Sequence, residues 1–161
     1  LKGNHEAMLE AFLNRSDSAG EWRQHGGNEA LRSYRVDVSA ALASGGTQAL
    51  AEALSVAMPA EHTRLLARLR TSYTVGDYFF CHAGVRPGVP LDRQTEQDLL
   101  WIRREFMDWR RGFEKVIVHG HTPIDQVELG GQRINIDTGA YATGRLTCLV
   151  LEGNERRMLS A

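Results

Sequence analysis

The amino-acid sequence predicts a single domain of the α/β or α+β type. Apolar residues at helical spacing dominate residues 6–70, whereas short segments rich in β-branched and aromatic residues dominate residues 71–151. A chain of 161 residues is long enough to bury one hydrophobic core. Because the first half supplies helices and almost no strand, the later strands need a partner sheet or a helical layer.

Helices are expected throughout the first half, and their ends follow from local breaks. Gly26-Gly27 interrupts one helical region, a loop at 44–47 precedes the next helix, and Met58-Pro59 ends it. The expected ranges are 6–14, one or two helices within 19–34, 47–57 and about 60–70. The clearest helical pattern comes later, over residues 94–111.

Strands are expected from residue 71 onward. Residues 71–75 (TSYTV) and 78–82 (YFFCH) are rich in β-forming residues, and Gly76-Asp77 between them fits a hairpin turn. Residues 115–118 (KVIV) have the composition of a short buried strand. Further strands are expected at 126–129, 132–136 and 145–151.

Charge and cysteine content exclude several classes of function. The chain has 19 Lys and Arg against 20 Asp and Glu, a net charge of −1, which argues against a nucleic-acid surface or a polybasic membrane patch. Cys81 and Cys148 are too few and too far apart for a disulfide framework. The sequence shows no leader and no apolar run near 18 residues, so a cytoplasmic protein without membrane or nucleic-acid partners is expected. Cys81 is expected to be a small buried strand residue.

Four stretches share one form, an apolar run followed by polar residues beside glycine: LKGNHE, YFFCHAG, VIVHGHTP and INIDTGA. In open α/β sheets, ligands bind beyond the carboxyl ends of the strands, so such ends converge if the strands are neighbours. Imidazole nitrogens and amide oxygens are plausible ligands for manganese, iron or zinc. The polar side chains at these ends are those of Asn4, His5, His82, His119, His121 and Asp137.

Each element alone has an ordinary structural explanation. A single histidine at a strand end is more often structural than a ligand, and the neighbouring glycines can be simple turn residues. His25 and His62 lie in polar helical contexts and are expected on the surface. The repetition of one pattern four times is what favours a functional site.

The motifs GNHE, HAG, LLWIRREF, HGHTP and NIDTGA occur in this order and together resemble those of the calcineurin-like metallophosphoesterases. More narrowly, they resemble the bacterial branch of the serine/threonine phosphoprotein phosphatases, which also contains symmetrical diadenosine tetraphosphate hydrolases. GNHE alone is only moderately specific, whereas the ordered set is strong. The resemblance extends over essentially the whole chain.

This resemblance implies part of an αββα sandwich, with two mixed β-sheets flanked by helices and a helical insert at about residues 14–70. It implies a two-metal enzyme, with manganese favoured and iron or zinc as alternatives, in which a metal-bridging hydroxide attacks the phosphate. Asn4, His82 and His121 then match ligands of the second metal. His5 matches the general acid that protonates the leaving oxygen.

Other positions follow from the same resemblance. Arg103, in LLWIR, would grip the phosphate oxygens, for which a bidentate guanidinium is suited. Asp137 would lie near the metals without ligating them, and His119 would stand beside a ligand without being one. For Arg86, in the loop after His82, a functional and a structural role are equally open.

The family pattern also contains two earlier motifs, GDxHG and GDxxDRG, and neither occurs in these 161 residues. The first supplies ligands to the first metal, and the second supplies the bridging carboxylate. We therefore expect the N-terminal βαβ part of the fold to be absent, and the 161-residue chain by itself to be inactive or nearly so.

Three interpretations stay open on these residues. The first is a serine/threonine protein phosphatase-like enzyme acting on phosphate monoesters of a phosphorylated protein or a small phosphoester. The second is a symmetrical diadenosine tetraphosphate hydrolase, since the metal site is common to both. The third is a non-catalytic phosphoesterase-like module or a structural metal domain. The residues do not indicate an oligomeric state.

Overall fold

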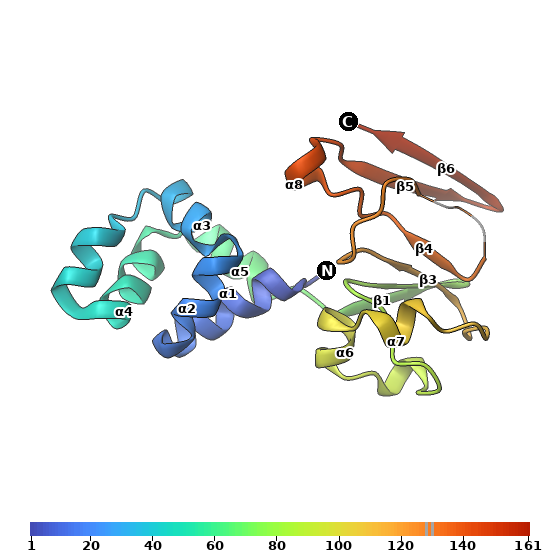
Figure 1. Ribbon diagram of the computed structural model, residues 1–161, viewed down its shortest axis with the longest axis horizontal. Coiled ribbons are helices and arrows are strands. Elements are labelled where there is room, and N and C mark those ends of the chain that lie inside the picture. Colours follow the sequence, from blue (N-terminus) through green and yellow to red (C-terminus); the bar gives the residue numbers. More distant parts are fainter. Residues whose placement is uncertain (128, 130) are drawn as a thin grey trace. The chain divides into compact units, whose positions relative to one another are not determined.

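The computed structural model describes residues 1–127, 129 and 131–161. Contacts divide the chain into two compact units (Figure 1). One is helical and comprises Lys2–Leu69, and the other comprises Leu1 with Arg70–Ala161. No helix in the described part of the chain is long and apolar enough to cross a membrane.

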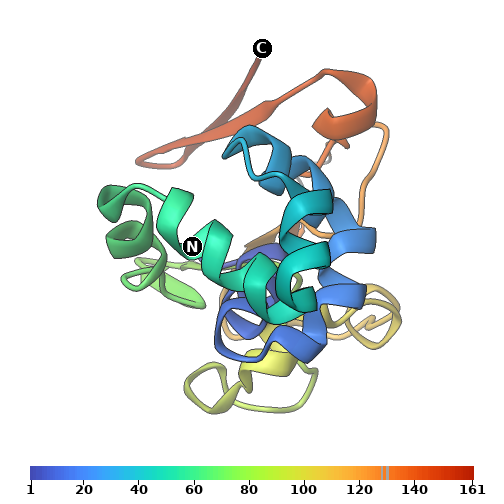
Figure 2. The same cartoon turned by 90° about the vertical axis from the view of Figure 1, so that its left-hand side faces the viewer.

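The helical unit contains five α-helices (Figures 1 and 2). Phe12 stacks on Trp22 with ring centroids 4.6 Å apart, and both side chains are buried. Leu31, Leu50 and Leu54 also belong to the apolar interior. The helices are α1 (Asn4–Asn14), α2 (Ala19–Trp22), α3 (Asn28–Ser33), α4 (Val38–Ala57) and α5 (Ala60–Leu66), with a π-helical turn (Arg23–Gly27) between α2 and α3.

The expected break at Gly26-Gly27 is confirmed, and the break expected at 44–47 is confirmed at Gly45 and Gly46, although a further helical segment precedes it. Helix α4 begins at Val38, where the Asp37 side chain accepts a hydrogen bond from the Ala40 N–H at 2.9 Å. Gly45 and Gly46 leave helical dihedral angles and kink α4 between its first two turns and the segment that follows.

The second unit is built on a four-stranded sheet in the order β1-β2-β3-β4. β1 (Ser72–Val75) and β2 (Tyr78–Cys81) form the expected antiparallel hairpin. β3 (Val116–His119) pairs parallel with β2, and β4 (Arg133–Asn135) pairs parallel with β3. The sheet is therefore mixed, and three of its strands run in the same direction.

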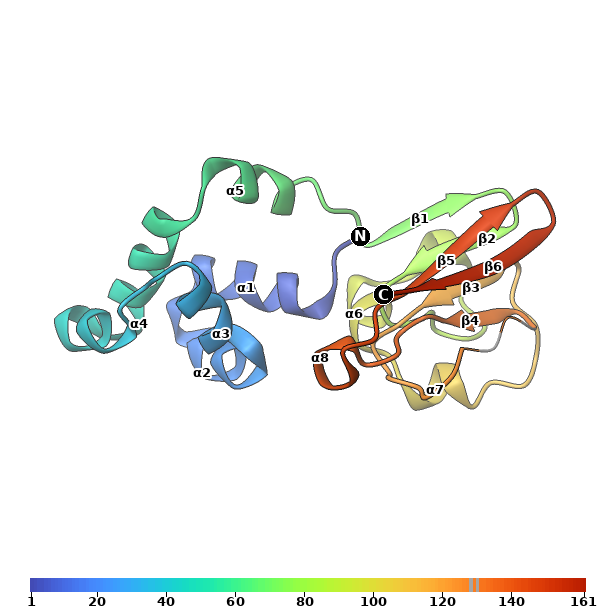
Figure 3. The same ribbon diagram turned by 90° about the horizontal axis from the view of Figure 1, so that it is seen from above.

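A second sheet and a pair of helices cover the two faces of this sheet (Figures 1 and 3). The antiparallel hairpin β5 (Thr147–Glu152) and β6 (Glu155–Ser160) lies over one face, where Arg156 Nε donates to Tyr78 Oη at 3.0 Å. Helices α6 (Glu96–Trp101) and α7 (Arg104–Met107) cover the other. The core on that side contains Phe79, Cys81, Ile117, Leu99, Ile102 and Phe106.

Two expectations about the second unit are wrong, and neither the short helix α8 (Ala140–Thr143) nor strand β6 was expected. The helix expected over 94–111 is two short helices, because Arg103 adopts φ −133° and ψ −93° between them. The strand expected at 126–129 is not formed at residues 126, 127 and 129, and residue 128 lies outside the described residues. Strand β6 follows a tight turn at Gly153, at φ 58°, that the sequence analysis did not identify.

Candidate metal centre

The carboxyl ends of β2, β3 and β4 meet at one edge of the sheet. In the parallel register, Phe80 pairs with Val118, and Val118 pairs with Ile134. The chain therefore leaves the three strands side by side, into the segments that carry His82, His121 and Asp137. The predicted convergence of these three strand ends is confirmed.

His82 and His121 lie against one another at this edge. His82 Nε2 is 3.0 Å from His121 Nδ1, and the two rings meet edge to face with centroids 4.8 Å apart. The indole of Trp101, at the end of α6, forms a further edge contact with His121 at 6.1 Å. Two imidazoles 39 residues apart in the chain thus present nitrogens to the same point.

The turn after β3 directs His121 toward His82. Gly120 N–H donates to the His82 carbonyl at 2.8 Å, and a Cβ at Gly120 would lie only 3.2 Å from Asp137 Cβ. His121 itself has φ 65°, in the left-handed region that non-glycine residues rarely adopt. Such backbone strain, of about 1–3 kcal/mol, concentrates at functional sites.

Arg103 joins this turn from the break between α6 and α7. Its NH1 donates to the His121 carbonyl at 3.0 Å and to Thr122 Oγ1 at 3.2 Å, and the side chain is exposed. A continuous helix over 94–111 would not give Arg103 its observed backbone angles. The unexpected break between α6 and α7 therefore places Arg103 against the turn that carries His121.

Asp137 organises the loop after β4. Its Oδ1 accepts a hydrogen bond from Gly139 N–H at 2.9 Å, and its own N–H donates to Asn135 Oδ1 at 3.0 Å. Asn135, which is buried, also donates from Nδ2 to the Thr122 carbonyl at 2.7 Å. Sequence reasoning missed Asn135, although its place at the end of a strand, two residues before Asp137, is the signal that could have revealed it.

His119 points into the protein interior. It is buried, and its ring meets the edge of Phe106 with centroids 4.8 Å apart. Burial lowers the pKa of His119 to about 4, so the ring is neutral at ordinary pH. These surroundings are those of a packing residue.

Asn4 and His5 belong to the helical unit. Helix α1 begins at Asn4, and Glu6 Oε2 accepts a hydrogen bond from Gly3 N–H at 2.7 Å, closing the first turn. Asn4 is buried, whereas His5 is exposed and its ring lies beside Gly26. The sheet unit therefore gathers His82, His121, Arg103 and Asp137, while Asn4 and His5 are presented by the other unit.

The pair of histidines is within hydrogen-bond distance, with His82 Nε2 and His121 Nδ1 3.0 Å apart. Two imidazole nitrogens bound to one tetrahedral ion at about 2.1 Å stand about 3.4 Å apart, so the two rings would have to separate slightly to share an ion. Among the described residues no group of three or more His, Cys, Asp or Glu side chains is suited to hold an ion. The pair would therefore supply only part of a coordination sphere.

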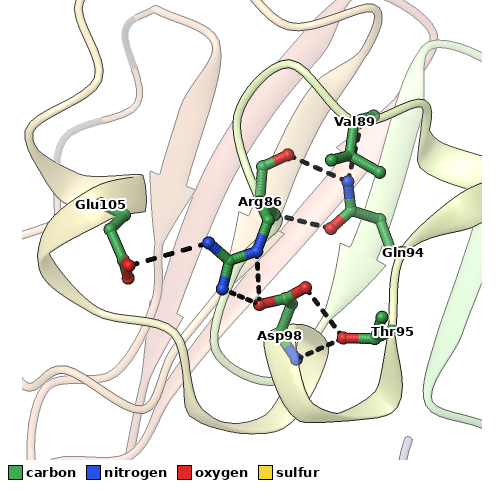
Figure 4. Close-up of polar contacts among 6 residues, drawn as sticks. All are labelled: Arg86, Val89, Gln94, Thr95, Asp98 and Glu105. Carbon is green, nitrogen blue, oxygen red and sulfur yellow. Dashed lines mark hydrogen bonds and ion pairs between the residues drawn. The ribbon is translucent and has the colours of Figure 1, made fainter.

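Arg86 anchors the loop after β2 through contacts with Asp98 and Gln94 (Figure 4). Its guanidinium donates to Asp98 Oδ1 from Nε at 3.0 Å and from NH2 at 2.6 Å. The hydrogen bonds from Arg86 and from Thr95 hold the pKa of the Asp98 carboxyl below its usual value, although burial opposes them. The geometry thus favours the structural role that the sequence left open.

Known proteins similar to this chain are tetraphosphatases. An asymmetrical bis(5'-nucleosyl)-tetraphosphatase from Bacillus thuringiensis (strain Al Hakam) is 33% identical over 86 residues, covering 43% of this chain and 34% of that protein. One from Geobacillus thermodenitrificans (strain NG80-2) is 39% identical over 56 residues, covering 35% of this chain and 22% of that protein. The chain thus matches only 22% to 34% of the length of these curated relatives. No family model matches it.

A crystal structure provisionally assigned as a diadenosine tetraphosphatase has a similar fold. The TM-score is 0.62 at 19% identity, and the match covers 98% of this chain and 66% of that one. The predicted α/β fold with two sheets is therefore confirmed. Two mixed sheets were expected; among the described residues the first sheet is mixed, but the second is an antiparallel hairpin.

Proposed function

We propose that the protein is a metal-dependent phosphohydrolase that cleaves dinucleoside polyphosphates. The observation that carries the proposal is the 3.0 Å approach of His82 Nε2 to His121 Nδ1 at the edge where parallel sheets bind ligands. The similarity to bis(5'-nucleosyl)-tetraphosphatases favours a dinucleoside tetraphosphate as the substrate. It also favours asymmetrical over symmetrical cleavage.

In this proposal His82 and His121, with Asn4, hold one divalent ion of a pair, and manganese is the first candidate. Divalent ions neutralise phosphate charge and activate water for attack on phosphorus. His5 donates a proton to the leaving oxygen, a role that contributes about 10²–10⁴-fold to the rate. The amide of Asn4 and the two imidazoles are neutral ligands, so the charge of the ion must be balanced by other groups.

Arg103 and Asp137 support the same reaction. Both hydrogen bonds of Arg103 to the turn at His121 and Thr122 come from NH1, and a guanidinium has further donors that can meet a phosphate oxygen. Asp137 fixes the loop after β4 through Gly139. Its proposed role is to hold that loop beside the metal ligands without binding the ion.

The test is hydrolysis of diadenosine tetraphosphate by the polypeptide that the natural gene encodes, with manganese and with products separated by chromatography. ATP and AMP in equal amounts are expected, because asymmetrical cleavage produces this pair, and symmetrical cleavage produces two molecules of ADP. His82→Ala and His121→Ala should abolish turnover. A phosphoserine peptide tests the serine/threonine phosphatase alternative. Faster turnover of that peptide, or no turnover of the dinucleotide, would overturn the proposal.

A further inference from the structure

The helical unit contains a cavity of about 430 Å³ that has no role in the proposed function as described so far. Its lining includes His5, Trp22, His25, Tyr34, His62 and Leu65, and all its lining residues belong to Lys2–Leu69. His25 and His62, expected as unremarkable surface residues, are indeed exposed, but they lie on the same cavity as the predicted general acid. The volume is within the range of small-molecule sites, about 300–1,000 Å³.

Gly26 lines this cavity, and Gly27 packs behind its wall. Gly26 has φ 91°, a left-handed conformation that favours glycine, and it turns the chain between α2 and α3. A Cβ at Gly27 would lie 2.6 Å from Trp22 Cδ2, so the backbone packs directly on the indole. A Cβ at Gly26 would lie 3.8 Å from the His5 ring. The break that the sequence predicted at Gly26-Gly27 therefore lies where His25 and His5 line the same cavity.

The polar groups of the cavity have defined hydrogen-bonding roles. His25 Nδ1 is 2.9 Å from the Glu21 carbonyl, which can only accept, so Nδ1 carries the proton. In the neutral ring, Nε2 of His25 is then a hydrogen-bond acceptor. Across the cavity, Tyr34 Oη and His62 Nδ1 are 2.8 Å apart and join the end of α3 to α5.

The apolar groups suit a flat aromatic ligand. Trp22 is only 3% exposed, with one face stacked on Phe12 and the other against the Gly27 backbone, so it forms part of the wall and offers no free face. The ring of Tyr34, which meets His62 edge to face, is the aromatic group that the cavity offers to a ligand. Leu65 is 62% exposed and lies on the same cavity, so apolar surface there is left in contact with water. A nucleobase has two apolar faces and a polar edge, and it stacks on aromatic side chains whatever its sequence context.

We propose that this cavity binds the base and ribose of one nucleotide of the substrate, with an exocyclic amino group of the base donating to His25 Nε2. The choice of a nucleoside rests on the proposed function. His5, as the general acid, must reach the leaving oxygen, and that oxygen carries the remainder of a dinucleotide. The departing nucleotide is therefore bound beside His5, and this cavity is the site that the same unit offers there.

The test is isothermal titration of adenosine into the 161-residue chain without metal. Saturable binding is expected, and amide chemical-shift changes should be confined to the residues that line the cavity. His25→Ala should weaken adenosine binding about 10-fold but leave purine riboside, which lacks the amino group, nearly unchanged. Tyr34→Ala should weaken both ligands. Tyr141→Ala is the matched control, since Tyr141 is 89% exposed and lies outside the helical unit.

Circular dichroism of each variant shows whether it is folded, and His25→Ala removes an exposed side chain that the fold does not need. Absence of saturation up to about 10 mM adenosine, or shift changes outside the helical unit, would overturn the inference. Equal loss of adenosine and purine riboside in His25→Ala would overturn the role of His25. Because no metal or turnover is involved, these outcomes are independent of whether the phosphohydrolase proposal holds.

Discussion

Arg86 grips one carboxylate oxygen of Asp98 with two nitrogens, Nε at 3.0 Å and NH2 at 2.6 Å (Figure 4). Thr95 Oγ1 donates to the other oxygen at 2.8 Å, and the Asp98 side chain is only 7% exposed. Gln94 adds bonds to the Arg86 and Val89 carbonyls. The loop that follows β2 is thereby fastened to the beginning of α6.

Replacing Asp98 by asparagine should lower the free energy of unfolding by roughly 1–3 kcal/mol. The amide oxygen is a weaker acceptor, and the Arg86 charge loses its buried counter-ion. Urea unfolding measures the change. Glu105→Gln is the control, because Glu105 lies 3.7 Å from Arg86 and is 65% exposed, so its loss should change stability by less than about 0.5 kcal/mol. Equal effects of the two substitutions would contradict this account.

Asp98 should also make stability depend on pH at the acidic end. Its pKa is lowered in the folded protein, chiefly by the Arg86 hydrogen bond, so the folded state favours the ionised form. The contribution of Asp98 to the free energy of unfolding is fully present above the pKa that Asp98 has in the unfolded chain, near 3.8. It is lost as the pH falls through the lower pKa of Asp98 in the folded protein. The stability difference between wild type and Asp98→Asn should therefore shrink below about pH 4. A difference that grows at acidic pH would contradict the assignment.

Local sequence signals were sufficient to predict most strands of the sheet unit. The hairpin around Gly76-Asp77 and the strand ending at His119 followed from composition and turn residues. The prediction of one helix over residues 94–111 was wrong because the apolar spacing continues through the backbone break at Arg103. At this break Arg103 contacts the turn at His121. Such a tertiary effect leaves no periodic signal.

The candidate site shows the same division. The repeated pattern of an apolar run followed by polar residues beside glycine was sufficient to predict that His82 and His121 lie close together. Asn135 was missed, because its two hydrogen bonds join loops that are separate in the sequence. The cavity beside His5 was missed because it depends on how α5 packs within the helical unit.

The two cysteines should differ sharply in reactivity. Burial raises the pKa of Cys81 to about 12, whereas Cys148 is exposed on β5. Since the thiolate is the reactive form, Ellman's reagent at pH 8 should modify one thiol quickly and the second only after unfolding. Cys148→Ser should abolish the fast reaction. Rapid modification of Cys81 in the folded variant would contradict the packing of β2.

The 161-residue chain should bind a transition-metal ion through His82 and His121 but show no hydrolysis of p-nitrophenyl phosphate with manganese. Neutral imidazoles supply ligands, yet the sequence lacks the GDxHG and GDxxDRG motifs. Titration with zinc should show at least about 10-fold weaker binding for His82→Ala or His121→Ala. His62→Ala is the matched control and should bind as wild type. Robust turnover that His5→Asn abolishes would show that the missing motifs are not required.

Gly84 should be far less tolerant of a side chain than Gly88, four residues later. Gly84 has φ 150°, and a Cβ there would lie 2.3 Å from Phe106 Cδ1, whereas Gly88, at φ 77°, has no atom within 4 Å of its Cβ position. Gly88→Ala therefore carries only the backbone penalty, about 1 kcal/mol, whereas Gly84→Ala also displaces the buried Phe106 ring at an additional cost of about 1–3 kcal/mol.

Thermal unfolding of the two alanine variants measures this difference directly. Gly84→Ala should have the lower melting temperature by several degrees, since about 1 kcal/mol corresponds to roughly 2–4 °C in a chain of this size. Because the Phe106 ring also contacts His119 and packs behind the sheet edge, the same variant should weaken zinc binding at His82 and His121. Similar melting temperatures for both variants would show that α7 does not press on this loop as the contacts indicate.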